Sequence, residues 1–156
     1  MKRDLHFEAV YPHAIEKVWR AITDPQAIAE WLMPNDFQPR VGHKFQFRTK
    51  PQPGWDGVVN CEVLECEPPR RLVYTWKSSA LDTKLAITLE STAGGTKLVL
   101  AHTGFAGMKA LMLSFLLGSG WKGIVRKHLL AVIERIDAQG NLAPRPDGRP
   151  ARGCEN

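Results

Sequence analysis

Hydrophobic and polar residues change their spacing several times along this chain, and each change predicts a secondary-structure element. In residues 4–11 the apolar Leu5, Phe7, Ala9 and Tyr11 alternate with the polar His6 and Glu8, which is typical of a half-buried strand. Between residues 15 and 22 the apolar positions recur every three or four residues, as on one face of a helix. Asp24 and Pro25 then predict the N-cap and first position of a second short helix with Ile28, Trp31 and Leu32 on its buried side.

Alternation returns in the middle of the chain and predicts a run of antiparallel strands with one apolar face. The five segments are residues 44–48, 55–66, 72–76, 84–90 and 98–102. Residues 93–95 (Ala-Gly-Gly) predict a hairpin between the last two of these strands. Apolar residues from Trp121 to Ile136 hold a helical period and predict a long closing helix, whereas residues 118–120 (Gly-Ser-Gly) predict a break before it.

The order of these elements predicts an α+β fold in one domain. A curved six-stranded antiparallel sheet would wrap around the long C-terminal helix, with two short helices between the first and second strands. We place this domain at residues 1–137 and expect a flexible C-terminal tail at 138–156, which is rich in proline and glycine. The nearly all-apolar residues 108–117 admit three interpretations: a lid or core segment, a dimer contact, or a contact with membrane or lipid.

Composition narrows the functional classes. The net charge of +5 is spread along the 156 residues without a basic cluster, which argues against nucleic-acid binding. No apolar run is long enough to span a bilayer, and the N-terminal residues lack the apolar core of a signal peptide, so we expect a cytoplasmic protein with no stable membrane insertion. Three cysteines are an odd number without a spaced framework, which indicates reduced thiols.

Several segments, taken together and in order, resemble a known family. They are residues 18–25 (VWRAITDP), Trp31-Leu32, residues 68–76 (PPRRLVYTW), residues 102–105 (HTGF) and Gly120-Trp121. The chain resembles the helix-grip fold of the START and Bet v 1-like (SRPBCC) superfamily, and within it the bacterial family that is similar to the activator of the Hsp90 ATPase. The resemblance implies a cavity between the sheet and the C-terminal helix.

Residues expected on the concave face are the candidate ligand-binding residues. They are Trp31, Phe45, Phe47, Val59, Cys61, Tyr74, Trp76, Leu85, Ile87, Leu100, His102, Phe105, Trp121, Val125 and Leu129. Aromatic side chains, Trp55 included, are either pocket lining or plain core. His102 is either a functional residue, as a hydrogen-bond donor to the ligand or a proton shuttle, or a buried histidine satisfied by its neighbours. No sequence pattern calls for a metal or another cofactor.

Three functional hypotheses remain open. The first is a binding protein, a monomer or weak homodimer, that holds a hydrophobic, aromatic or lipid-like small molecule in the cavity. The second follows from the resemblance and is a partner of an Hsp90-type chaperone ATPase, although the eukaryotic activator carries a further domain for which these 156 residues have no room. The third is a cyclase- or hydrolase-like enzyme in which His102 and Tyr74 are the candidate acid–base residues. We expect a binding protein rather than an enzyme.

Overall fold

The computed structural model describes residues 2–51, 53, 55–78 and 81–144. Its elements follow one another as β1 (Lys2–Tyr11), α1 (Ile15–Thr23), α2 (Pro25–Trp31), β2 (Lys44–Arg48), β3 (Val58–Glu67), β4 (Arg71–Ser78), β5 (Leu81–Thr92), β6 (Gly95–Ala106), α3 (Met108–Gly123), the π-helical segment η1 (Ile124–His128) and α4 (Leu129–Glu134). The predicted α+β fold and its element order are confirmed.

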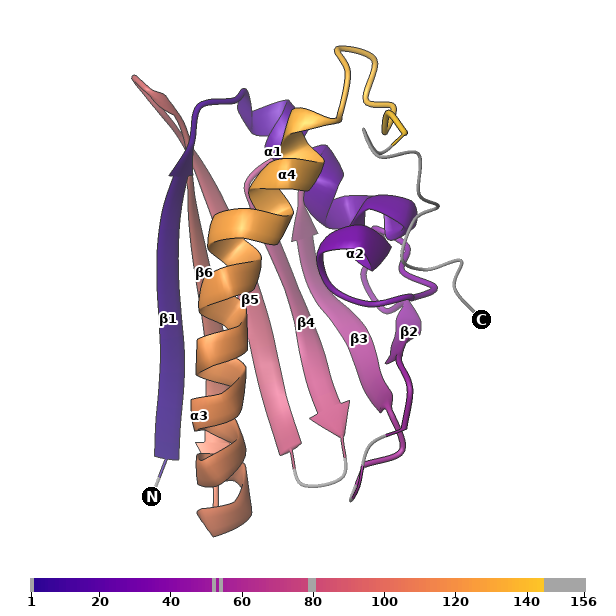
Figure 1. Ribbon diagram of the computed structural model, residues 1–156, viewed down its shortest axis with the longest axis vertical. Coiled ribbons are helices and arrows are strands. Elements are labelled where there is room, and N and C mark those ends of the chain that lie inside the picture. The colour runs from indigo at the N-terminus through magenta and orange to yellow at the C-terminus, as the bar shows by residue number, and fades with distance from the viewer. Residues whose placement is uncertain (1, 52, 54, 79–80, 145–156) are drawn as a thin grey trace.

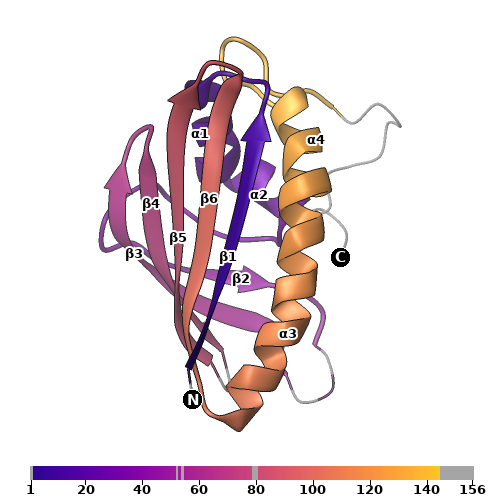
Figure 2. The same ribbon diagram turned by 90° about the vertical axis from the view of Figure 1, so that its left-hand side faces the viewer.

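The six strands form one antiparallel sheet in the order β1-β6-β5-β4-β3-β2. Neighbours in sequence are neighbours in space except for β1, which pairs with β6 from the other end of the sheet. The sheet curves around the continuous helical rod of α3, η1 and α4 (Figures 1 and 2). In this rod, α3 lies against β1 and β6, while α4 packs against α1 and α2.

The joint between α1 and α2 forms as the sequence predicts. The Asp24 side chain accepts a hydrogen bond from the Gln26 amide at 3.2 Å, and Pro25 occupies the first helical turn, where its missing amide costs nothing. The Trp31 indole is buried and donates to the Ala21 carbonyl at 2.9 Å, which ties the two short helices together.

The expected helix break at residues 118–120 is wrong. Helix α3 runs through Gly118 and Gly120 without interruption. Gly118 lies close to β1, where an added Cβ would meet the Leu5 side chain at 3.5 Å. A glycine costs a helix about 1 kcal/mol, and packing of the surrounding rod against the sheet outweighs that local preference.

The irregularity of the rod lies further along, in η1. There the Leu129 amide donates to the Ile124 carbonyl, one residue beyond the α-helical partner. The hydroxyl of the buried Tyr11 donates to the Val125 carbonyl in the same widened turn at 2.7 Å. This hydrogen bond fastens the middle of the rod to the end of β1.

A buried ion pair joins α2 to the end of the rod. Both carboxylate oxygens of Glu30 accept from the Arg135 guanidinium, at 2.5 and 3.3 Å, and the two side chains are only 2% and 16% exposed. Arg135 also donates to the Ala143 carbonyl. The start of the predicted tail therefore turns back on the helices, where Ile136 and Leu142 form a β-bridge. The rest of that tail, residues 145–156, lies outside the described residues.

Two expectations on membrane and dimer contacts fall on residues 108–117. Their backbone belongs to α3, but the side chains of Met108, Leu111, Met112 and residues 114–117 lie outside the described residues. No helix in the described part of the chain combines the length and apolar character needed to cross a membrane.

Candidate functional site

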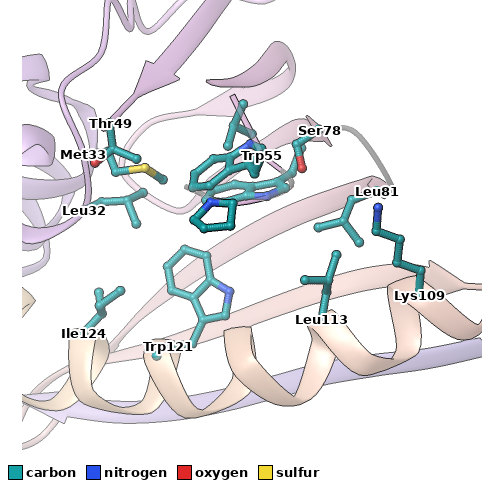
Figure 3. A pocket seen from close by; sticks show the side chains of 14 residues that line it. Leu32, Met33, Thr49, Trp55, Ser78, Leu81, Lys109, Leu113, Trp121 and Ile124 are labelled. Atoms are coloured by element: carbon teal, nitrogen blue, oxygen red, sulfur yellow. The ribbon is translucent and has the colours of Figure 1, made fainter. Parts of the chain in front are cut away.

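A cavity of about 510 Å³ opens between α3 and the β3–β5 half of the sheet. The end of α2 and the β2–β3 connection complete its wall (Figure 3). Its lining residues are Leu32, Met33, Thr49, Pro53, Trp55, Val59, Trp76, Ser78, Leu81, Lys109, Leu113, Gly120, Trp121 and Ile124. The volume is in the range of small-molecule sites, and the lining is mostly apolar with a few polar groups, as such sites are.

Three tryptophans form the aromatic part of this wall. The rings of Trp76 and Trp121 meet edge to face, with their centroids 5.6 Å apart. The Trp76 ring also packs on Phe47, with a centroid distance of 5.4 Å. The Trp55 indole donates to the Val58 carbonyl at 3.1 Å, which holds the β2–β3 connection over the cavity. The aromatic surface is thus continuous with the core and fixed in orientation.

A chain of hydrogen bonds behind the wall positions two of these rings. The Trp121 indole N–H donates to Nδ1 of His102 at 3.0 Å. The Thr83 hydroxyl donates its one hydrogen to the Trp76 carbonyl at 2.7 Å. His102 Nε2, which lies 2.8 Å from Thr83 Oγ1, must therefore be the donor to that oxygen. The chain runs in one direction, from Trp121 through His102 and Thr83 to the backbone of β4.

This series of hydrogen bonds requires a neutral imidazole at His102. The residue is fully buried, and burial lowers its pKa to about 3. A second ring proton would point at the Trp121 N–H, which is a donor and cannot accept it. His102 therefore behaves as a satisfied buried histidine that positions Trp121, the second of the two interpretations that the sequence left open.

Tyr74, the other candidate for acid–base chemistry, is not a hydrogen-bond partner of His102. Its ring packs among Phe37, Phe45 and Phe47, and burial raises its pKa well above the usual value for a phenol. The hydroxyl thus stays protonated at neutral pH. The two residues are not arranged as a general acid and base.

The structure divides the predicted ligand-binding residues into two groups. Val59, Trp76 and Trp121 line the cavity. The others fill the hydrophobic core behind it: Trp31, Phe45, Phe47, Cys61, Tyr74, Leu85, Ile87, Leu100, His102, Phe105, Val125 and Leu129. They support the cavity wall without lining it.

Most other lining residues carry no periodic signal in the sequence. Met33 follows the last turn of α2, Thr49 and Pro53 belong to a connection, and Ser78 and Leu81 stand at strand ends. The alternation of apolar residues identifies what faces the sheet's concave side, but not which end of that side stays open. Trp55 could be identified as a pocket candidate from the sequence, because a large aromatic residue in a proline- and glycine-rich connection is expected to pack against a surface.

The polar side chains of the cavity wall, apart from the indoles, are those of Thr49, Ser78 and Lys109. Among the described residues, no group of three or more His, Cys, Asp or Glu side chains is arranged to hold a metal ion. Cys61 is buried and free, and burial together with the nearby Asp36 raises the pKa of its thiol. It is an unreactive part of the core.

Comparison with known proteins supports the family resemblance. The family described as activator of Hsp90 ATPase homolog 1-like protein has a sequence model that matches residues 12–134. No curated protein matches the chain.

Solved structures share the whole fold. MLL2253 from Mesorhizobium loti is 36% identical, with a TM-score of 0.77 over 86% of this chain and 99% of that chain. CalU16 from Micromonospora echinospora is 26% identical, with a TM-score of 0.68 over 85% and 76% of the two chains. BH1534 from Bacillus halodurans, 24% identical, has a TM-score of 0.70 over 83% and 97%.

Proposed function

The chain belongs to the family of activator of Hsp90 ATPase homolog 1-like proteins, and from that premise we propose that it binds a hydrophobic or aromatic small molecule in the cavity beside α3. The observation that carries the proposal is the cavity itself, about 510 Å³ with three tryptophans in its wall. Removing an apolar ligand from water contributes about 25 cal/mol for each Å² of apolar surface buried.

Preorganisation of the wall adds to this argument. Hydrogen bonds to the protein itself hold Trp55 and Trp121, so ordering these rings costs little when a ligand enters. Rigid indole faces favour flat, apolar partners, which stack or meet them edge to face.

A cavity-filling variant tests the proposal. Leu113→Trp places a bulky indole in the cavity wall contributed by α3, whereas Val10→Trp adds the same ring at a position that is 61% exposed on β1. Naphthalene, 1-naphthol and decanol are the probes, and isothermal titration calorimetry measures their affinity. We expect micromolar binding with a negative heat-capacity change for wild type and Val10→Trp, and a loss of about tenfold or more for Leu113→Trp.

Far-UV circular dichroism establishes that both variants remain folded. If none of the probes binds the wild-type protein, or if Leu113→Trp binds them as well as Val10→Trp does, ligand binding in this cavity is wrong.

The family description favours a second candidate, a partner of an Hsp90-type chaperone ATPase. The ATPase rate of a bacterial Hsp90 with and without an excess of this protein tests it. Stimulation is the expected result, and an unchanged rate at saturating excess would end this candidate. Leu113→Trp shows whether any stimulation depends on the cavity.

A further inference from the structure

One end of the cavity differs in chemistry from the rest. Ser78 and Leu81 face each other as the last pair of the β4–β5 ladder, and Lys109 comes from the first turn of α3. The start of β5 lies beside the end of β6, which leads directly into α3, so the fold brings these residues together. Figure 3 shows Ser78, Leu81 and Lys109 at one end and Leu32, Met33 and Thr49 at the other.

Lys109 carries the only formal charge among the 14 residues that line the cavity. The described lining residues include no carboxylate that would neutralise it. Asp82, which follows the lining residue Leu81, pairs with Lys77 at 3.8 Å and is 83% exposed. The ion pairs found among the described residues do not include Lys109.

The start of α3 reinforces this positive charge. Its N-cap is Gly107, no side chain caps the first turn, and that turn contains no acidic residue. The partial positive charge of a helix N-terminus is therefore left without a protein anion in the same turn that carries Lys109. An apolar cavity with one cationic end suits a ligand with an apolar body and one negative group.

We propose that the ligand is an apolar monocarboxylate, an aromatic or alicyclic acid, whose ring lies against Trp76 and Trp121 and whose carboxylate pairs with Lys109. The Ser78 hydroxyl donates a hydrogen bond to the second carboxylate oxygen. This inference rests on the proposed function and adds the charge and polarity of the bound molecule to it.

The expected preference follows from the exposure of Lys109. An ion pair with an exposed ammonium gains little in water, but an adjoining apolar wall lowers the local dielectric and a carboxylate accepts charge-assisted hydrogen bonds. We expect the carboxylate to improve affinity by about fivefold over a neutral group of the same shape. The gain shrinks as salt concentration rises, because this end of the cavity is open to ions.

The test compares 1-naphthylacetic acid with 1-naphthylacetamide, which have the same size and differ in charge. Calorimetric titration at neutral pH, in low and high salt, gives both affinities for the wild-type protein and three variants. Lys109→Gln removes the charge and Lys109→Arg keeps it. Lys122→Gln is the matched control, since Lys122 is an exposed residue of the same helix that does not line the cavity.

We expect the acid to bind wild type, Lys109→Arg and Lys122→Gln about fivefold more tightly than the amide. Lys109→Gln should lose this preference through weaker binding of the acid alone. Equal binding of acid and amide to wild type, or a preference that survives in Lys109→Gln, overturns the carboxylate assignment and leaves the proposed function intact. If neither compound binds wild type, the proposed function fails and the assignment fails with it.

Discussion

A histidine at the centre of the core derives its role from the direction of its hydrogen bonds. Trp121 can only donate, and Thr83 has already used its hydrogen on the β4 backbone, so His102 must accept at one nitrogen and donate at the other. Only the neutral ring satisfies both neighbours. The residue most tempting as a catalyst in the sequence thus supports the cavity wall.

This arrangement predicts a pH dependence of stability. The folded pKa of His102 is about 3, below the value near 6.5 in an unfolded chain, so the unfolded state binds a proton that the folded state refuses. The contribution of neutral His102 to the free energy of unfolding is fully present above pH 6.5. It declines as pH falls towards 3, by up to about 1.4 kcal/mol per pH unit. Urea unfolding at several pH values measures it.

His102→Gln is the comparison for this prediction. Its amide can donate and accept in the same region but does not titrate, so its free energy of unfolding should be lower at neutral pH and should change less between pH 6.5 and 4. Parallel pH profiles for the two proteins would contradict a neutral, buried His102.

At the scale of elements, the helical rod shows how packing overrides local preference. Glycines at 118, 120 and 123 lie inside continuous helical structure, although such residues ordinarily weaken a helix. The rod is held from outside, by β1 and by the Tyr11 hydroxyl at the Val125 carbonyl. Glycine spacing alone cannot reveal this support, because it comes from the other end of the chain.

Glycine-to-alanine substitutions at the two ends of α3 should change the free energy of unfolding in opposite directions. An added Cβ meets nothing within 4 Å at either Gly107 or Gly123. Gly123 has helical angles, so Gly123→Ala should raise the free energy of unfolding by about 0.5–1 kcal/mol. Gly107 has a φ of 91°, where alanine is strained, so Gly107→Ala should lower it by about 1 kcal/mol or more.

Chemical denaturation measures both glycine variants against wild type. Destabilisation by Gly123→Ala would show that the rod needs a glycine there for a reason other than space. No change in Gly107→Ala would show that the turn before α3 can relax.

Across the whole molecule, one partly buried arginine joins three segments that are distant in sequence. Arg135 contacts Glu30 of α2 and the Ala143 carbonyl of the C-terminal turn from the end of α4. Arg135→Met takes the guanidinium away from the buried Glu30 carboxylate and should therefore cost about 3 kcal/mol. Arg126→Met, at an exposed position of η1, should change stability by less than about 0.5 kcal/mol.

Thermal and urea unfolding compare the two arginine variants. If Arg135→Met is as stable as Arg126→Met, the pair does not hold α2 against the rod. Adding Glu30→Gln to Arg135→Met tests the coupling of the two side chains. If they are coupled, the double variant loses less free energy of unfolding than the sum of the two single variants. If they are not, Glu30→Gln restores little of the stability.

The same long-range contacts mark the limit of prediction from sequence. Alternation and the Asp24-Pro25 joint were sufficient for the strands and short helices, because those signals are local. The Glu30–Arg135 pair and the hydrogen bonds of His102 could not be predicted, since each joins residues far apart in the chain. The cavity lies where elements end, so its lining at Met33, Ser78 and Lys109 follows from the assembled fold alone.

The tryptophan wall also makes the protein its own optical reporter. Three of the five tryptophans in the chain line the cavity, while Trp31 is buried between the short helices. Most of the indole rings therefore lie beside the space that a ligand would occupy. Entry of a molecule should change the intensity and colour of that emission without any attached dye, and the replacement of each cavity tryptophan by phenylalanine would show which ring reports it.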